Sequence, residues 1–225
     1  MDAPDRSKLL VASARRIAER CPRLVDQCYW AGTSVVALED LQHRESFDLD
    51  FHTREALVDT RPLLAELHKA FPRAFEIVDP PDGHGSGFTG LLDAGHGHKV
   101  TMQVMAGFED VPDHDLQPSS TVAGLRRITL PRYVADKVQC VLERLEARDL
   151  FDIHAALRHQ PALERALRRA VAEQDELLFA ERLTGWTDAS ITDDLRAHRE
   201  VDPAHAIAMR DRLKAVLHEH REARP

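Results

Sequence analysis

The sequence has few cysteines and no long apolar run. Its three cysteines, Cys21, Cys28 and Cys140, are an odd number and form no C-x-x-C pair, so neither a disulfide framework nor a zinc ribbon is expected. No stretch approaches the roughly 18–20 apolar residues of a membrane span, and the first ten residues lack the layout of a signal peptide. We therefore expect a cytoplasmic protein with no membrane segment.

An excess of positive charge is also missing. The formal net charge of the 225 residues is −8, which argues against a protein that coats nucleic acid by bulk electrostatics. An enzyme that binds a structured RNA through a local basic patch stays compatible with this charge. The arginine pairs 126–127 and 168–169 are candidates for such contacts, although arginine pairs are more often solvated surface.

The periodicity of apolar residues changes near residue 130. Before it, strand-like and helix-like segments alternate, and after it every segment has helical spacing. We predict strands at 27–31, 46–51, 74–78, 99–105 and 125–130, a loop with a short hairpin arm at 80–98, and helices at 7–20, 34–41, 53–71, 131–146, 149–158, 161–182 and 203–221. The chain thus has an expected α+β domain at 1–130 and a helical domain at 131–225.

Two aspartates in the segment RESFDLDF are the main candidates for chemistry. On a strand, Asp48 and Asp50 would share one face with Ser46, with Cα atoms of the two acids roughly 6.5–7 Å apart. Their charges repel unless a cation lies between them, and Mg²⁺ prefers carboxylate and phosphate oxygens. The alternative is a solvated strand face, but aspartate has a low strand propensity.

A glycine turn precedes this pair. Gly32, Thr33 and Ser34 stand between a predicted strand and a predicted helix. The first N–H groups of a helix have no intrahelical partner and are suited to binding phosphate. Such a turn is usually only a helix start, but together with the D-x-D pattern it predicts a triphosphate site beside a metal site.

The stretch WAGTSVVALEDLQHRESFDLDF resembles the pattern of the AbiEii/AbiGii nucleotidyltransferase toxins, in the DNA-polymerase-β-like superfamily. The stretch ITLPRYVADKVQCVLERLEARDLFDIHAAL resembles the later lysine and R-D-x-x-D helices of that family. The resemblance implies a polymerase-β-like mixed sheet flanked by helices, followed by a helical bundle. Gly32, Thr33 and Ser34 then fall on the phosphate-facing turn, and Arg44 and Ser46 on nucleotide-contacting positions.

The resemblance assigns the remaining site residues as well. Asp48 and Asp50 match the metal-binding acids, and Lys137 matches the lysine that contacts the triphosphate. Asp149 and Asp152 fall on the acidic helix, where at least one is functional. Without the resemblance, Lys137 could simply extend to water, and Asp149 could be a helix cap; we therefore rank Asp152 above Asp149.

The sequence departs from the pattern at two positions. Ala31 replaces the first glycine of the usual pair, and Gln103 stands where the wider superfamily often has a third acid. Because an amide is a poor ligand for Mg²⁺, we expect Asp149 or Asp152 to supply that acid. A zinc site at His84, His96 and His98 is the weaker alternative, because no fourth ligand is obvious.

The expected reaction is transfer of a nucleoside monophosphate from an NTP to an acceptor hydroxyl, with Mg²⁺ or Mn²⁺ as cofactor. By resemblance, the acceptor is a tRNA 3′ end and the protein is the toxin of a toxin–antitoxin pair, with a cognate antitoxin as partner. The alternatives are a small-molecule nucleotidyltransferase of the antibiotic-modifying kind and a catalytically degenerate nucleotide-binding module.

Overall fold

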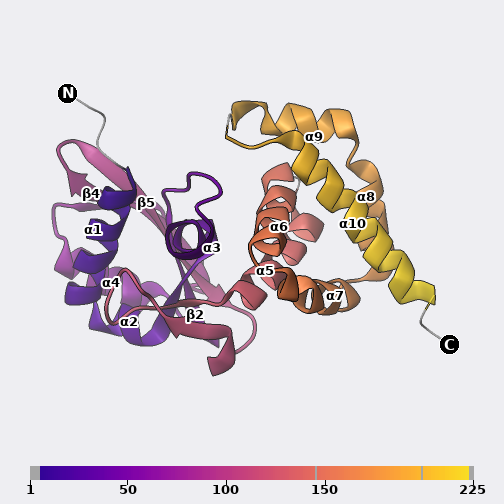
Figure 1. The fold of residues 1–225 in the computed structure, drawn as a ribbon. Coiled ribbons are helices and arrows are strands. Elements are labelled where there is room, and N and C mark those ends of the chain that lie inside the picture. Colours follow the sequence, from indigo (N-terminus) through magenta and orange to yellow (C-terminus); the bar gives the residue numbers. More distant parts are fainter. Residues whose placement is uncertain (1–5, 145, 199, 223–225) are drawn as a thin grey trace. The chain divides into compact units, whose positions relative to one another are not determined.

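The chain divides into two compact units, which meet in sequence between Thr129 and Leu130 (Figure 1). The computed structural model describes residues 6–144, 146–198 and 200–222. Within these residues the first unit combines helices with strands, and the second unit is helical. The expected α+β class is confirmed.

A seven-stranded mixed sheet forms the centre of the first unit, in the order β3-β4-β5-β2-β1-β7-β6. Its strands are β1 (Cys28–Ala31), β2 (Leu49–Ala56), β3 (Phe75–Asp79), β4 (Gly87–Gly95), β5 (His98–Gly107), β6 (Leu116–Pro118) and β7 (Arg126–Ile128). β2 runs antiparallel to β1 and parallel to β5. In this register Asp50 lies between Ala31 on β1 and Gln103 on β5.

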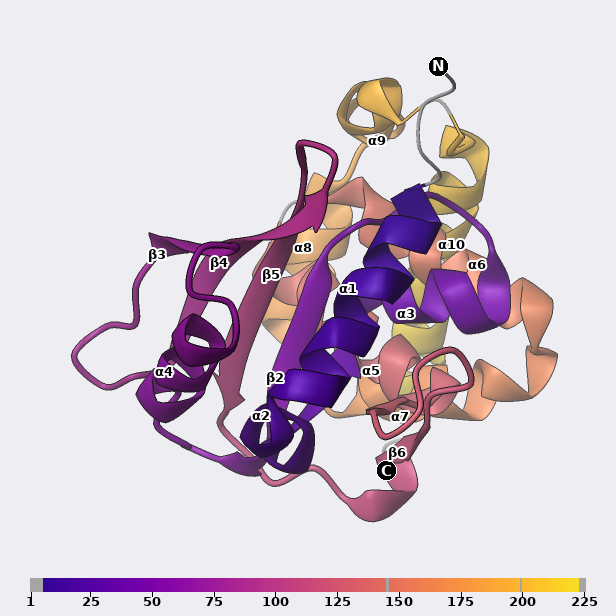
Figure 2. The same cartoon turned by 90° about the vertical axis from the view of Figure 1, so that its left-hand side faces the viewer.

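Helices pack on this sheet through apolar residues at helical spacing. The helices of the first unit are α1 (Arg6–Arg20), α2 (Pro22–Gln27), α3 (Gly32–Val36) and α4 (Arg61–Ala70), and a π-helical turn, Ala37–Leu41, continues α3. α1 buries Leu10, Ala14 and Ile17, which lie on one helix face. It packs on β4 and β5, while α2 packs on β1 and β2 (Figure 2).

The predicted strand at 46–51 and the predicted helix from Thr53 were wrong in their boundaries. The strand begins only at Leu49, and it continues through the expected helix start to Ala56. Thr53 is fully buried, and its hydroxyl donates to the carbonyl of Glu55 and accepts from the N–H of Gly107. Pairing with β5 on one side and β1 on the other overrides the local helical pattern.

The glycine-rich segment 80–98 contains a full strand, β4, instead of a short arm. β4 pairs with β3 on one side and with β5 on the other. Gly90 lies under the ring of Phe75, so a side chain at this position would meet the ring atoms. The glycine that suggested a loop is therefore required for the packing of a strand.

The second unit consists of helices α5 (Leu130–Glu143), α6 (Ala147–His159), α7 (Glu164–Ala172), α8 (Glu176–Gly185), α9 (Asp188–Asp194) and α10 (Pro203–Glu222). α10 packs along α6, α7, α8 and α9, and α5 packs on α6 and α7. The single helix expected at 161–182 was wrong. The helical conformation ends at Ala172 and begins again at Glu176. Asp175 caps α8, because its side chain accepts from the N–H groups of Leu177 and Leu178.

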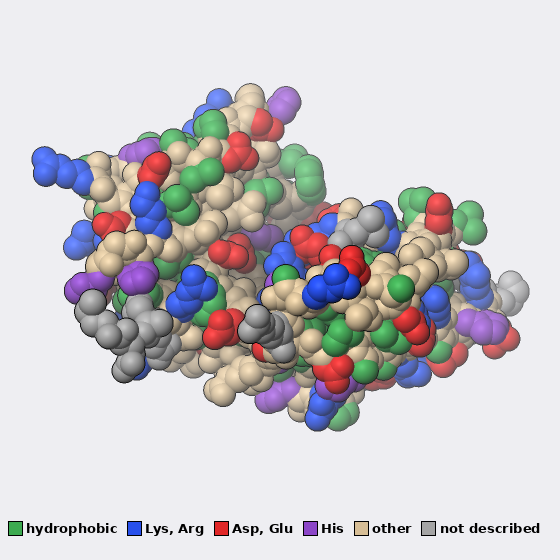
Figure 3. All heavy atoms as spheres, turned by 90° about the horizontal axis from the view of Figure 1, so that it is seen from above, with side chains coloured by type: hydrophobic (Ala, Val, Ile, Leu, Met, Phe, Trp, Pro, Cys, Tyr) green, Lys and Arg blue, Asp and Glu red, His purple; other side chains and the backbone are tan. Residues whose placement is uncertain are grey.

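Across the described part of the chain, no helix combines the length and the apolar character of a membrane span. Acidic and basic side chains are interspersed on the face seen in Figure 3.

Cys21 and Cys28 are buried, and burial raises the pKa of each thiol to about 12. Both thiols are therefore protonated and poorly reactive near neutral pH.

Candidate functional site

The glycine turn directly follows β1 and forms the start of α3, as expected, and its conformation requires glycine. Gly32 has a φ of +75°, in the left-handed region that other residues rarely adopt. A Cβ at this position would overlap the Oδ2 atom of Asp50 and would lie 3.0 Å from its Cγ atom. The Asp50 carboxylate thus occupies the space beside the turn that any side chain at position 32 would fill.

The segment before β2 is tied to the same turn by side-chain hydrogen bonds. Arg44 donates to the hydroxyl of Thr33 at 3.1 Å. The Ser34 hydroxyl donates to the hydroxyl of Ser46 at 2.9 Å, and it accepts from the backbone N–H of Asp48 at 3.2 Å. Residues predicted to bind nucleotide and residues predicted to bind metal therefore lie together in the first unit.

Asp48 and Asp50 differ in how the structure holds them. Asp50 belongs to the central strand β2, whereas Asp48 lies one residue before the strand and is exposed. Gln103 occupies the neighbouring position on β5, so Asp50 is the predicted acid that the sheet holds, and Asp48 comes from the segment before it. Within the described residues, no group of three or more His, Cys, Asp or Glu side chains is arranged to hold a metal ion.

The two carboxylates nevertheless fit Mg²⁺ in the way that nucleotide enzymes bind it. Mg²⁺ commonly takes one or two protein carboxylates and completes its coordination with water and substrate phosphates. The donor set of Asp48 and Asp50 supplies oxygen ligands only, as this ion prefers. The glycine turn beside Asp50 is also the start of α3, and the first N–H groups of a helix are suited to phosphate oxygens.

In the second unit, the other predicted residues form a buried ion network. The ammonium group of Lys137, on α5, contacts Asp149 at 2.7 Å and Asp152 at 2.9 Å, both on α6. The two carboxylates are fully buried, and Lys137 is 6% exposed. The lysine therefore does not extend to bulk water. Asp149 is not the cap of α6, because Glu146 stands at that position and the Asp149 side chain binds Lys137.

A fourth member of this network, Arg144, was not predicted. Its guanidinium donates to both oxygens of Asp149, each at 2.9 Å. Arg144 directly follows α5 and lies seven residues, or about two helical turns, after Lys137. This spacing places the two side chains on the same side of the helix axis. That spacing was the signal in the sequence. Lys137 and Arg144 thus offset the charges of Asp149 and Asp152, and Arg144 also contacts Glu146 at 3.3 Å.

The charges stabilise each other against the cost of burial. Burial alone would lower the pKa of Lys137, but the carboxylates of Asp152 and Asp149 outweigh it and raise this pKa far above the usual value. The hydrogen bonds from Arg144 to Asp149 likewise raise the pKa of Arg144. Lys137 is thus a permanent cation at physiological pH.

Three of the four arginines considered for RNA contact form ion pairs within their own units. Arg127 is 5% exposed and forms ion pairs with Glu39 at 2.8 Å and Asp40 at 2.6 Å. Arg126 pairs with Asp113. The Arg168 guanidinium pairs with Glu164 and Glu219, as a solvated surface arginine commonly does. The buried Arg127 pair fixes the π-helical turn that follows α3.

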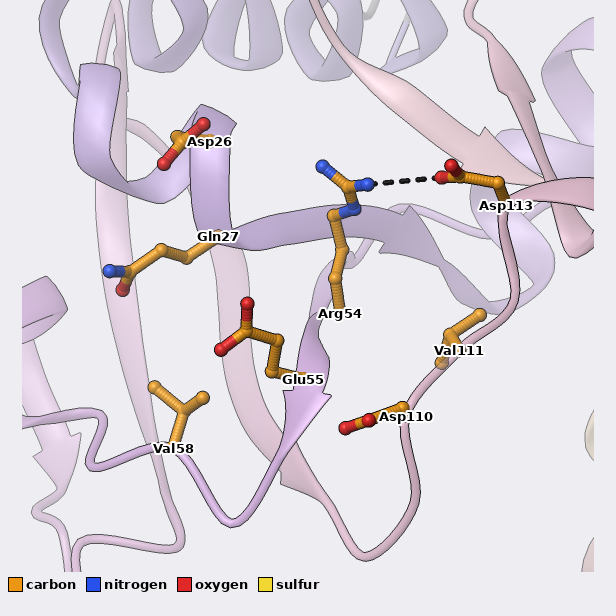
Figure 4. Close-up of a pocket in the computed structure, with 8 residues that line it drawn as sticks. All are labelled: Asp26, Gln27, Arg54, Glu55, Val58, Asp110, Val111 and Asp113. Atoms are coloured by element: carbon orange, nitrogen blue, oxygen red, sulfur yellow. Dashed lines mark hydrogen bonds and ion pairs between the residues drawn. The ribbon is translucent and has the colours of Figure 1, made fainter.

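A separate hollow of about 380 Å³ lies at the other end of β2 (Figure 4). Its lining includes four acids, Asp26, Glu55, Asp110 and Asp113, and Arg54 contacts Asp113 at 3.1 Å. None of the predicted site residues lines it. The histidines considered for zinc are part of no metal-binding group within the described residues.

Comparisons with known proteins identify the family of the chain. The family described as "Nucleotidyl transferase AbiEii toxin, Type IV TA system" matches residues 32–223, a range that contains every predicted site residue. No curated protein sequence matches the chain.

Solved structures share the fold. JHP933 from Helicobacter pylori is similar with a TM-score of 0.61 and 16% identity, over 98% of this chain and 96% of that one. MenT4, a nucleotidyltransferase toxin from Mycobacterium tuberculosis H37Rv, is similar with a TM-score of 0.59 and 15% identity, over 95% of this chain and 84% of that one. With the family match over most of its length, the chain belongs to the AbiEii nucleotidyl transferase toxin family and is a nucleotidyltransferase.

Proposed function

We propose that this nucleotidyltransferase is metal-dependent and moves a nucleoside monophosphate from an NTP to the 3′ end of a tRNA. In this proposal it acts in the cytoplasm as the toxin of a toxin–antitoxin pair. The family supports the reaction class, the NTP substrate and an antitoxin partner. The metal and the tRNA acceptor are the parts that the proposal adds.

The contact between Gly32 and Asp50 carries the proposal. A turn with backbone N–H groups suited to phosphate lies directly against an acid suited to a divalent cation. A purely structural glycine turn would not need a carboxylate in this place. A metal bound by Asp50 is therefore adjacent to phosphates bound by the turn.

The residues of the first unit divide the work. The turn at Gly32, Thr33 and Ser34 binds phosphate oxygens, while Arg44 and Ser46 orient the nucleotide. Asp48 and Asp50 would hold Mg²⁺ or Mn²⁺, which would neutralise phosphate charge and activate the acceptor hydroxyl. The acceptor oxygen forms its bond to the α-phosphorus in line with the bond from that phosphorus to the β-phosphate oxygen, which breaks. The β- and γ-phosphates leave together as pyrophosphate.

The proposed role of Lys137 is to supply positive charge to the triphosphate. An ammonium ion has three N–H donors, and the contacts with Asp149 and Asp152 use two of them. Asp149 orients the lysine in this scheme. Asp152 is proposed as a further catalytic acid because it falls on the family's acidic helix, and its carboxylate contacts Lys137 at 2.9 Å.

Two acceptor classes need to be separated by experiment. A small-molecule acceptor, as in antibiotic-modifying enzymes, uses the same chemistry at phosphorus. A catalytically degenerate module, which Gln103 suggested from the sequence, does not fit a chain that belongs to a nucleotidyl transferase family. RNA remains our choice, because the matched family is one of toxins.

Incubation of the protein with each α-³²P-labelled NTP and total RNA tests the proposal. We expect label in the tRNA band with the wild type. We expect no label with Asp48→Ala, or with the wild type in the presence of EDTA. Label in no RNA, despite measurable binding of Mg-NTP, would refute the RNA acceptor. Failure to bind Mg-NTP would refute the metal-dependent mechanism.

A further inference from the structure

The backbone of Asp48 lies outside the sheet that holds Asp50. The ladder between β2 and β5 begins with Leu49 opposite Met102, and the next pair is Asp50 opposite Gln103. Ladder hydrogen bonds therefore begin only after Asp48. An acid that must stay near Asp50 needs another contact to fix its position.

Ser34 provides that contact. Its side chain is fully buried at the start of the α3 helix. The hydroxyl accepts from the Asp48 N–H at 3.2 Å and donates to the Ser46 hydroxyl at 2.9 Å. The Ser34 hydroxyl oxygen thus holds the chain at Ser46 and at Asp48, the two neighbours of Phe47. These contacts use the donor and one acceptor position of the hydroxyl.

We propose that Ser34 is a positioning residue, whose hydroxyl fixes the backbone of Asp48 so that its carboxylate is preorganised beside Asp50. The inference rests on the proposed role of these two acids. It gives the Ser34 side chain a task distinct from nucleotide contact, while the Ser34 backbone N–H stays part of the phosphate-facing turn. Ser34 acts on the metal through Asp48.

Removal of the hydroxyl has a defined consequence. In Ser34→Ala the N–H of Asp48 loses its acceptor, and Ser46 loses its donor. Because the sheet does not hold these residues, the segment 46–48 gains freedom, and binding a cation must then restrain it. The expected result is weaker metal binding even in the absence of nucleotide.

Ser13 supplies the matched control. It is also a buried serine, 1% exposed, on the helix α1 of the same unit. Its hydroxyl has no hydrogen-bond partner within the described residues. Ser13→Ala therefore makes the same chemical change in an equally buried place without removing a hydrogen bond.

Two measurements on the nucleotide-free protein test the inference. Amide hydrogen exchange by NMR reports on the Asp48 N–H, and Mn²⁺ titration followed by EPR reports on metal binding. In Ser34→Ala we expect about tenfold faster exchange at Asp48 and about tenfold weaker Mn²⁺ binding. Ser13→Ala should leave both unchanged, and Ser34→Cys, which keeps a weak acceptor, should be intermediate.

The outcomes separate this inference from the proposed function. If Ser34→Ala binds Mn²⁺ as tightly as the wild type, the inference alone is overturned. The same holds if the Asp48 amide of Ser34→Ala exchanges at the wild-type rate. Failure of the wild type to bind Mn²⁺, with and without NTP, would overturn the proposed function and the inference with it. A variant that only loses thermal stability, with Mn²⁺ affinity intact, also contradicts the inference. Should Ser34→Ala not fold, Ser34→Cys decides by the same criteria.

Discussion

Replacement of Gly32 by alanine should remove catalysis by displacing a carboxylate, and the structure separates this effect from backbone strain. Gly32 has a φ of +75°, and an alanine in this region costs about 1–2 kcal/mol. The new methyl group would also occupy the position of the Asp50 Oδ2 atom. Gly124 has a φ of +86°, but a Cβ added there would have no heavy atom within 4 Å beyond its chain neighbours. Gly124→Ala therefore carries the strain without the clash.

Both variants are measured by urea unfolding and by transfer of α-³²P-labelled NTP. Gly124→Ala should lose about 1–2 kcal/mol of unfolding free energy and keep the wild-type transfer rate. Gly32→Ala should lose at least as much stability, and its transfer rate should fall by about 100-fold, since a misplacement of about 1 Å at a reacting centre has this effect. Equal transfer rates in the two variants would refute the assignment of Asp50 to the site.

Three further predictions concern residues outside the glycine turn. Lys137→Met removes the lysine charge from the buried carboxylate of Asp152, while Asp149 keeps Arg144, and should cost about 3–5 kcal/mol of unfolding free energy in urea; a loss below about 1 kcal/mol would contradict the buried network. Burial would raise the pKa of Glu39, but hydrogen bonds from residues 119–121 outweigh it and lower the pKa. The Glu39 carboxylate therefore stabilises the fold at pH values above its unfolded pKa, and this stability is lost as the pH falls through the folded pKa. Glu39→Gln should therefore destabilise the protein more at pH 7 than at about pH 3 in thermal melts, and an equal effect at both would argue against this. Asp175→Ala removes the cap of α8 and should cost about 1 kcal/mol, seen as a lower midpoint in urea, whereas an unchanged midpoint would mean that the cap contributes nothing.

The sequence predicted those features that depend on local pattern. The apolar spacing of α1 follows from periodicity, and the structure has a helix there. The pairing of a glycine turn with the acid at position 50 could be inferred because neighbouring strands bring such residues together. The structure adds that Asp50 lies directly against Gly32.

Features that depend on tertiary contacts could not be read from the sequence. The extension of β2 past Thr53 depends on pairing with β5, which lies about 50 residues further along the chain. β4 is a strand because Gly90 accommodates the ring of Phe75, and glycine by itself indicates a loop. The burial of Lys137 between two acids also required the packing of α5 on α6.

The most direct test of the account is calorimetric titration of Mg-NTP into the wild type, Asp50→Asn and Glu55→Gln. Asp50 and Glu55 lie on the same strand, and Glu55 is exposed and lines the acidic hollow at the other end of β2. We expect wild-type affinity for Glu55→Gln and a loss of at least about tenfold for Asp50→Asn, because a charged metal ligand is removed. Wild-type affinity in Asp50→Asn, or a loss confined to Glu55→Gln, would contradict the central claim that Asp50 holds the metal beside the phosphate-binding turn.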